Sequence, residues 1–310
     1  ADVLVVATGS QAGFPAKDED VSTAASLSKY QAALATTQRA DRIAIVGGGP
    51  VGVELAGEIS FAYPGKDVTL FHAGARLLSS QSGLKPAVAE RLADQLRAAG
   101  VTLHLNARVD LDALDSVARD EAKADAALPD DVTTGPVMVA AGNGAACEVD
   151  AVFRCTGARC NSTAYVSGWL APAVEAPTGR LKVNQNLQVG AGAGDSEPSL
   201  QRDFNHEQVE SFKDVYAIGD CSAVPELNLM YSAVQQGRYV ATVLAKQAVA
   251  KPGAAPPKPY CPSPPFMLVS VGPKTGSAQL PTGQVASGNV VSLGKGRTLH
   301  TEEARRLLWA

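Results

Sequence analysis

The sequence is poor in the residues that build cross-linked or metal-bound folds. It contains only five cysteines and four histidines among 310 residues. The cysteines include no Cys-x-x-Cys pair and are too few for a disulfide framework in a chain of this length. This cysteine content is typical of proteins in a reducing compartment. The histidines show no metal-ligand spacing. We therefore predict no metal site.

An excess of positive charge and long apolar runs are also missing. The net charge is −4 and the pI is about 5.6, which argues against a nucleic-acid partner. No apolar run approaches the roughly 18 residues needed to span a membrane. Residues 1–7 have no basic leader region, so we do not expect them to be a signal peptide. They have the pattern of an interior strand, so we expect the chain to begin inside a domain, and we expect a cytoplasmic location.

The remaining composition is that of a globular protein with room for about two domains. Apolar runs predict strands, and helical spacing of apolar residues predicts helices. From residue 43 to residue 105 these elements alternate as β-α-β-α-β, which indicates a doubly wound α/β unit. Gly100 is expected to end the second helix of this unit. The predicted strands are 3–7, 43–46, 67–72 and 101–105, and the predicted helices are 50–61 and 84–99.

The rest of the chain is less regular. A helix is predicted between residues 20 and 35, and another over 231–250. Strands 136–141 and 146–150 should form a hairpin through Gly142-Asn143-Gly144, followed by separate strands at 151–157 and 215–219. The composition predicts an insertion at 110–135, a surface loop at 189–208 and a proline-rich linker at 251–265. Residues 266–310 should form a small β-rich unit that ends in a short helix over 302–309.

One stretch organises the chain, the glycine motif Gly47-x-Gly49-x-x-Gly52 between the strand 43–46 and the next helix. In this context the motif indicates dinucleotide binding. Gly47 permits the tight turn, Gly49 lets a pyrophosphate approach the backbone, and Gly52 lets the helix pack close to the strand. The helix start, with Pro50 and Val51, would offer N–H groups and a positive dipole end to the phosphates. The alternative is a glycine turn without a ligand.

Two further motifs flank this one, Ala7-Thr8-Gly9 before it and Tyr216-Ala217-Ile218-Gly219-Asp220 after it. In this order the three motifs resemble the flavoprotein family of FAD- and NAD(P)H-dependent pyridine-nucleotide-disulfide oxidoreductases. The resemblance implies two Rossmann-like dinucleotide-binding domains. The glycine motif would hold NAD(P)H, the Ala-Thr-Gly turn and Gly157 would lie near FAD, and Asp220 would bind its ribityl chain.

The resemblance also implies domain limits. The NAD(P)H domain would comprise residues 39–154 and would be inserted into an FAD domain formed by 1–38 and 155–252, with a small C-terminal α+β domain at 253–310. Family members carry a first glycine motif, for the ADP part of FAD, before the Ala-Thr-Gly turn. This sequence shows none there. We therefore expect the FAD domain to be incomplete and the chain to be a fragment, the alternative being an authentic chain with a compromised FAD site.

Within the family, several segments are similar to the branch of apoptosis-inducing-factor homologues, of the ferroptosis-suppressor type and close to type II NADH:quinone reductases. They are 68–72, 155–165, 181–189 and 268–272. Gln235 and Gln236 resemble a glutamine pair on the quinone side of type II enzymes. The resemblance implies hydride transfer from NAD(P)H to FAD and electron transfer to a quinone.

Each residue with an expected role has an alternative role. Asp220 could instead cap the following helix. Glu54, expected where nicotinamide and flavin meet, could merely complement the helix dipole. Gln235 and Gln236 could lie on a solvated helix face.

The choice between NADH and NADPH depends on the end of the strand 67–72. An acidic residue there would bind the ribose 2′-hydroxyl of NAD. The sequence instead has His72, followed by Arg76, which could pair with a 2′-phosphate. We therefore expect NADPH to bind at least as well as NADH. Alternatively, His72 packs against the adenine.

Two other functions stay open. One is a non-catalytic NAD(P)-binding or scaffold protein with a broken FAD site. The other is a flavin disulfide reductase, which is disfavoured because Cys155 and Cys160 flank a glycine turn rather than an electropositive helix start. The terminal helix could touch a membrane surface, although covering the core is the expected role. The sequence does not specify the oligomeric state.

Overall fold

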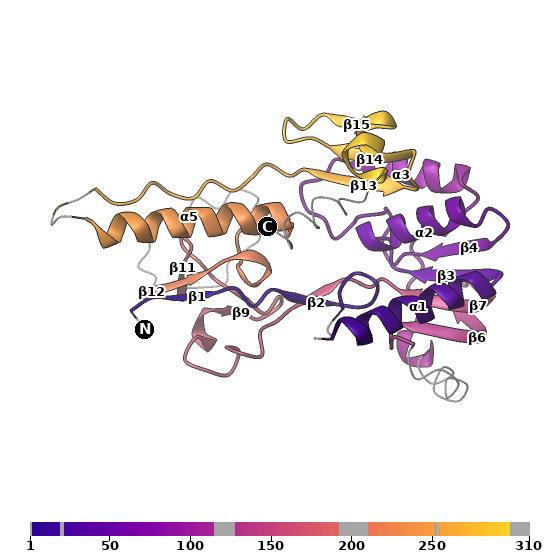
Figure 1. The fold of residues 1–310 in the computed structure, drawn as a ribbon, viewed down its shortest axis with the longest axis horizontal. Helices are drawn as coiled ribbons and strands as arrows, with labels where there is room; N and C mark the ends of the chain where they lie inside the picture. Colours follow the sequence, from indigo (N-terminus) through magenta and orange to yellow (C-terminus); the bar gives the residue numbers. More distant parts are fainter. Residues whose placement is uncertain are drawn as a thin grey trace. The chain divides into compact units, whose positions relative to one another are not determined.

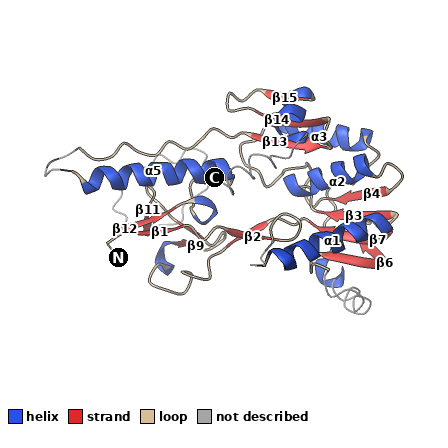
Figure 2. Cartoon of the chain, in the orientation of Figure 1, coloured by secondary structure: helices blue, strands red, loops and turns tan. Residues whose placement is uncertain are grey.

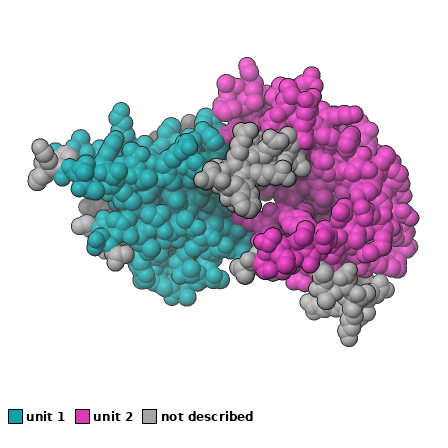
Figure 3. All heavy atoms as spheres, in the orientation of Figure 1, with its two compact units in different colours: residues 1–11, 158–264 teal, residues 12–157, 265–310 magenta. Residues whose placement is uncertain are grey.

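A computed structural model describes residues 2–18, 22–114, 128–191, 210–250, 253 and 255–297. The chain divides into two compact units, each formed by two separate stretches of sequence (Figure 3). The first unit comprises Ala1–Gln11 and Ala158–Pro264, and the second comprises Ala12–Gly157 and Pro265–Ala310. Both units combine helices with strands, so the predicted α/β class is confirmed (Figure 2).

The second unit is built around a five-stranded sheet with the strand order β5-β4-β3-β7-β6. The first four strands run parallel, and β6 runs antiparallel to β7. Helices α2 and α3 connect the successive strands β3, β4 and β5, which confirms the predicted β-α-β-α-β order (Figure 1). The bounds are β3 Arg42–Val46, α2 Pro50–Ala62, β4 Asp67–Phe71, α3 Pro86–Ala98, β5 Thr102–His104, β6 Val132–Ala140 and β7 Ala146–Arg154.

Local sequence signals explain where these elements begin and end. Val88, Leu92 and Leu96 recur at four-residue intervals and are fully buried, so this face fixes α3 against its neighbours. Gly100 ends the helix at φ +85°, in the left-handed region. Its N–H bonds to Arg97 O at 3.0 Å, and the N–H of Val101 bonds to Leu96 O at 3.0 Å. This pair of bonds is the Schellman motif, which satisfies carbonyls that the helix end would otherwise expose.

The second unit also contains helix α1 and a C-terminal part with the strands β13, β14 and β15. Strands β13, β14 and β15 form an antiparallel sheet in that order. At Gly57 of α2 a side chain would collide with the backbone of Val271, so the small residue allows α2 and β13 to pack closely. The bounds are α1 Thr23–Arg39, β13 Met267–Val271, β14 Thr275–Gln279, β15 Val285–Ser287 and α6 Asn289–Val291, followed by the single-turn helix η3 Ser292–Gly296.

The first unit contains a three-stranded sheet with the order β1-β12-β11, in which β1 and β12 are parallel. Strand β11 is antiparallel to β12. Among the described residues, no helix is long and apolar enough to cross a membrane. The bounds are β1 Leu4–Val6, β2 Ser10–Ala12, β8 Ala158–Cys160, η1 Ala171–Ala173, β9 Val174–Glu175, β10 Arg180–Leu181, β11 Gln188–Ala191, β12 Glu210–Ala217, η2 Gly219–Cys221 and α5 Met230–Ala248.

Several expected boundaries were wrong. The strand predicted at 151–157 is not separate, because Ala151 lies within β7 and pairs with both β3 and β6. The expected loop at 189–208 begins in β11, where Val189 is fully buried. The expected insertion at 110–135 ends in β6, and α1 begins at Thr23 rather than near residue 20. Residues 115–127, 192–209 and the predicted helix 302–309 lie outside the described residues.

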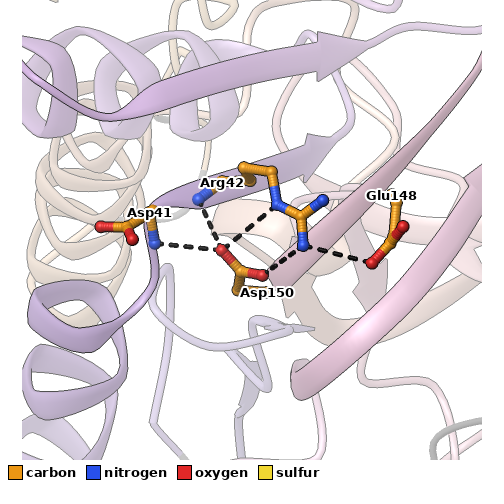
Figure 4. Close-up of polar contacts among 4 residues, drawn as sticks. All are labelled: Asp41, Arg42, Glu148 and Asp150. Atoms are coloured by element: carbon orange, nitrogen blue, oxygen red, sulfur yellow. Dashed lines mark hydrogen bonds and ion pairs between the residues drawn. The ribbon is translucent and has the colours of Figure 1, made fainter.

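Asp150 fixes the start of β3 to β7 (Figure 4). Its carboxylate accepts the backbone N–H groups of Asp41 and Arg42 at 3.1 and 2.8 Å, and Nη2 of Arg42 at 2.7 Å. The same guanidinium donates to Glu148 at 3.2 Å. The hydrogen bond from Arg42 is the main reason that the pKa of Asp150 lies below its ordinary value. A charged side chain thus holds two central parallel strands in register.

This cluster predicts an acid-dependent stability. Because the pKa of Asp150 is lower in the folded than in the unfolded protein, its contribution is present above the unfolded value of about 3.9 and is lost as the pH falls through the folded value. Asp150→Asn should lower the free energy of unfolding at about pH 7 and flatten its decline in acid. Urea unfolding across this range measures both effects.

The control is Asp94→Asn, since Asp94 forms an exposed pair with Arg97 and should change little. An unchanged pH dependence in Asp150→Asn would contradict the role of this carboxylate.

Candidate functional site

The glycine loop between β3 and α2 has the shape of a phosphate cradle. Gly47 has φ +121°, and a side chain there would collide with the carbonyl of Cys155. A side chain on Gly52 would collide with the carbonyl of Gly47, so the first turn of α2 lies directly against the strand end. Gly49 caps the helix, and an added Cβ there meets no atom within 4 Å. The backbone at Gly49 is therefore open to a ligand.

The start of α2 gives this open space its electrostatic character. Pro50 is the first helical residue, and the missing N–H of proline costs nothing at this position. Val51 and Gly52 follow in the first turn, whose N–H groups have no partner within the helix. The positive end of the helix dipole adds to these donors. The residues present therefore fit the pyrophosphate of a dinucleotide.

His72 supports the glycine loop. The N–H of Gly48 donates to Nδ1 of His72 at 3.1 Å, and Nε2 of His72 lies 3.0 Å from Oγ of Ser79. Since Nδ1 accepts, the neutral ring carries its proton on Nε2 and donates to Ser79. Burial lowers the pKa of His72 and so favours this neutral form. Neither Gly48 nor Ser79 could be identified as a partner of His72 from the sequence alone.

Arg76 lies in the segment after β4, in the same unit as the glycine loop. Together with Ser79 and Lys85 it lines a small cavity between this segment and the start of α3. The lining therefore includes two cationic residues and a serine. This composition is compatible with the expected contact between Arg76 and a 2′-phosphate.

Glu54 is tied to the C-terminal part of the second unit. Its Oε1 accepts Nζ of Lys295 at 2.6 Å and the N–H of Ser270 at 3.1 Å. Four residues further along α2, the pKa of Glu58 is raised, chiefly by burial and also by the charge of Glu54. Glu54 therefore does more than complement a helix dipole. Lys295 is 241 positions away in the sequence, which is why sequence reasoning missed it.

Two other expected motifs meet in the first unit, at the carboxyl ends of the neighbouring parallel strands β1 and β12. Oγ of Ser10, next to Ala7-Thr8-Gly9, donates to Oδ2 of Asp220 at 2.5 Å. Both turns contain a glycine in the left-handed region, with φ +69° at Gly9 and +72° at Gly219. An added Cβ at Gly9 meets no atom within 4 Å.

Ligands of open α/β sheets bind beyond the carboxyl ends of the strands, so this arrangement fits the flavin side of an FAD site. Asp220 does not cap helix α5, whose N-cap is Leu229. Asn161, which the sequence did not single out, supports the first turn by donating from Nδ2 to Thr8 O at 2.9 Å.

The two glutamines of α5 differ. Gln236 is only 3% exposed. Its Oε1 accepts the N–H of Gly219 at 2.7 Å, and its Nε2 donates to Oε1 of Glu226 at 2.7 Å. The amide oxygen and the amide nitrogen are both hydrogen-bonded within the protein. In place of the expected contact with a quinone carbonyl, Gln236 makes these internal contacts. It also does not lie on a solvated helix face. Gln235 is partly exposed.

Three positions considered in the sequence remain, Gly157, Cys155 and Cys160. Gly157 follows β7 with φ +103° and open space beside its Cα. Cys155 and Cys160 are both free thiols. Burial raises the pKa of Cys155 to about 12, which makes it a poor nucleophile. The burial of the Cys155 thiol therefore disfavours a redox role for this residue.

The chain is similar to known proteins in sequence and in fold. Residues 1–237 match the profile of the family described as pyridine nucleotide-disulphide oxidoreductase. Ferroptosis suppressor protein 1 of Mus musculus is 32% identical over 96% of this chain and 68% of its own length. Apoptosis-inducing factor homolog A of Dictyostelium discoideum is 28% identical over 90% of this chain and 63% of its own length.

Among solved structures, the water-forming NADH oxidase from Lactobacillus brevis, bound to NADH, superposes with a TM-score of 0.56 at 20% identity. The match covers 90% of this chain and 52% of that chain. The chain thus spans about half the length of this structure. The similarity supports the fold.

The bond between Gly48 and His72 predicts a pH dependence. Because burial lowers the pKa of His72, the unfolded protein takes up this proton first, and stability declines as the pH falls below the ordinary value of about 6.5. His72→Gln keeps a possible acceptor for Gly48 and removes the titration. The free energy of unfolding of this variant should vary less between about pH 7.5 and about pH 5.5 than that of the wild type.

Equal pH dependence in His72→Gln and the wild type would refute the assignment.

Proposed function

The chain belongs to the pyridine nucleotide-disulphide oxidoreductase family, and on this premise we propose that it passes a hydride from NAD(P)H to FAD and electrons on to a quinone-type acceptor. Membership confirms the predicted enzyme class, an oxidoreductase with FAD and NAD(P)H as cofactors. The acceptor, the domain limits and the residues that bind each cofactor are parts of the proposal.

The observation that carries the proposal is the open backbone at Gly49. A glycine with open space, placed at a helix start and held by two neighbouring glycines, suits the close approach of a pyrophosphate. Gly47 and Gly52 would fix the loop, and the first turn of α2 would supply N–H donors. His72 would keep the loop in its binding shape through Gly48.

The first unit would bind the flavin side of FAD. Asp220 would accept hydrogen bonds from the ribityl hydroxyls through its carboxylate, which also accepts the hydroxyl of Ser10. Gly9 and Gly219 would let the backbone approach the cofactor without a side chain between them. A bound flavin supplies the two-electron chemistry, and the protein supplies orientation and electrostatics.

Glu54 would act where the nicotinamide is held. Lys295 and the N–H of Ser270 fix its carboxylate in one orientation, which a flexible glutamate would not keep. In this proposal Glu54 orients the nicotinamide and excludes water, and Lys295 is the positioning residue for Glu54.

Of the proposed ligands, the quinone is the one whose binding residues are least defined by the structure. The proposal rests on the resemblance of Gln235 and its neighbours to the quinone side of related enzymes. We assign the acceptor contact to Gln235 alone, because the amide of Gln236 is engaged elsewhere. The proposed location is cytoplasmic, next to a membrane that carries the quinone. The C-terminal segment proposed to touch that membrane lies outside the described residues.

One experiment tests the proposed function with a variant of the open glycine. The purified protein, with any sequence that precedes residue 1 included, should show flavin absorbance and reduce a soluble quinone with NADPH. Gly49→Ala should retain the flavin and change the free energy of unfolding by less than about 0.5 kcal/mol, because the added Cβ meets no protein atom. It should weaken NADPH binding at least about tenfold.

Gly65→Ala is the control, because it also adds a Cβ in open space but lies outside the glycine loop. A wild-type protein that binds NADPH without flavin or quinone reduction would instead identify a non-catalytic nucleotide-binding protein.

The cofactor preference gives a separate prediction. Arg76→Gln should weaken NADPH binding about tenfold, the effect of one lost charge-assisted contact, and leave NADH binding nearly unchanged. Titration of both nucleotides by fluorescence measures this. Arg97→Gln, on an exposed helix face, should affect neither. Wild-type binding of NADPH more than about tenfold weaker than that of NADH would rule out a 2′-phosphate site.

A further inference from the structure

The first unit contains a chain of hydrogen bonds that leads from the proline-rich segment to the turn at Asp220. Gln236 is its centre. A carboxylate lies at one end of the amide and a backbone N–H at the other. Only one orientation of the amide satisfies both, with Nε2 toward Glu226 and Oε1 toward Gly219. The side chain is therefore fixed rather than adaptable.

The N–H group that donates to Gln236 belongs to Gly219, the residue at which the chain turns. Gly219 has φ +72°, in the left-handed region that favours glycine. It begins the helical turn η2, which contains Asp220. A bond of 2.7 Å at this N–H holds the peptide plane between Ile218 and Gly219, one residue before Asp220. The direction in which the Asp220 carboxylate leaves β12 thus depends on the amide of Gln236.

Glu226 holds the other end of Gln236. Its Oε1 also accepts the hydroxyl of Tyr260 at 2.9 Å, and its Oε2 accepts the N–H of Ser263 at 2.8 Å. Among the described residues, no cation pairs with Glu226. Three donors therefore satisfy the carboxylate, and such bonds to a charged acceptor are stronger than neutral ones. Burial, followed by the bond to Glu226, raises the pKa of Tyr260, so its phenol keeps the donated proton.

Tyr260 and Ser263 belong to the segment predicted as a linker, 251–265. Its described part is attached to the unit. The N–H of Tyr260 donates to Gln185 O at 2.8 Å, and the hydroxyl of Tyr239 donates to Lys258 O at 2.8 Å. Prolines restrict the backbone of such a segment, which lowers the entropy lost on ordering it. The segment can therefore hold Glu226 in place.

We propose that Gln236 is a positioning residue for the flavin side of the site, and that the proline-rich segment acts through Tyr260 and Glu226 to fix it. The path runs from Tyr260 to Glu226, Gln236 and Gly219, and then to Asp220. The role at the flavin rests on the proposed function. The mechanical coupling between the segment and the turn does not.

Two phenylalanine variants test the coupling. Tyr260→Phe removes the hydroxyl that bonds Glu226, while Tyr239→Phe removes a hydroxyl that bonds the same segment and Asn186 but not Glu226. Amide hydrogen exchange of residues 218–221, in the full chain without added cofactor, should accelerate severalfold in Tyr260→Phe and by about tenfold in Gln236→Leu, which loses the acceptor itself. Tyr239→Phe weakens the attachment of the segment but leaves the bonds of Glu226 in place, so it should accelerate the exchange less than Tyr260→Phe.

The same variants test the role at the flavin. Tyr260→Phe should weaken FAD binding severalfold and alter the visible circular dichroism of the bound flavin, which reports its geometry. NADPH binding should stay unchanged in each variant, and both flavin readouts should change less in Tyr239→Phe than in Tyr260→Phe.

The outcomes separate the two claims. Equal exchange in Tyr260→Phe and Tyr239→Phe would overturn the coupling. Faster exchange with unchanged FAD binding and dichroism would overturn the positioning role. Faster exchange in a chain whose wild type binds no FAD would support the coupling and reject the proposed function.

Discussion

The approach of Gly52 to the carbonyl of Gly47 is the constraint on which the nucleotide side depends. No side chain fits between them, so helix α2 begins directly against the end of β3. This contact places the helix start beside the open backbone of Gly49 and carries Glu54 to Lys295. His72 then ties the intervening Gly48 to the end of β4. A methyl group at position 52 would disturb all of these arrangements together.

The flavin side depends on hydrogen bonds rather than on close packing. Gly9 and Gly219 turn the chain after two parallel strands, and the direction of Asp220 is set by Ser10 and Gln236. Such bonds contribute modestly when made, but a buried partner left unsatisfied costs more. A site built in this way is sensitive to residues that never touch the ligand, which is why Glu226 and Tyr260 belong to its description.

The features that could be predicted from the sequence are those that interactions between nearby residues determine. The glycine motif, the four-residue spacing in α3 and the stop at Gly100 each depend on neighbours within a few positions, and the order of strands and helices follows from them. Contacts between residues that are far apart in the sequence could not be predicted in this way. Examples are the contacts of Glu54 with Lys295 and of Ser10 with Asp220. Gln236 was identified as important but for a different contact, because its spacing on the helix did not reveal its burial.

The central claim is that a dinucleotide binds at the loop between β3 and α2. The most direct measurement is a titration of the labelled protein with NADPH, followed by amide NMR. The account predicts the largest shifts at Gly48, Gly49, Val51 and Gly52, with saturation in a single binding event. Shifts that leave these amides unchanged, or that centre on another part of the chain, would contradict it.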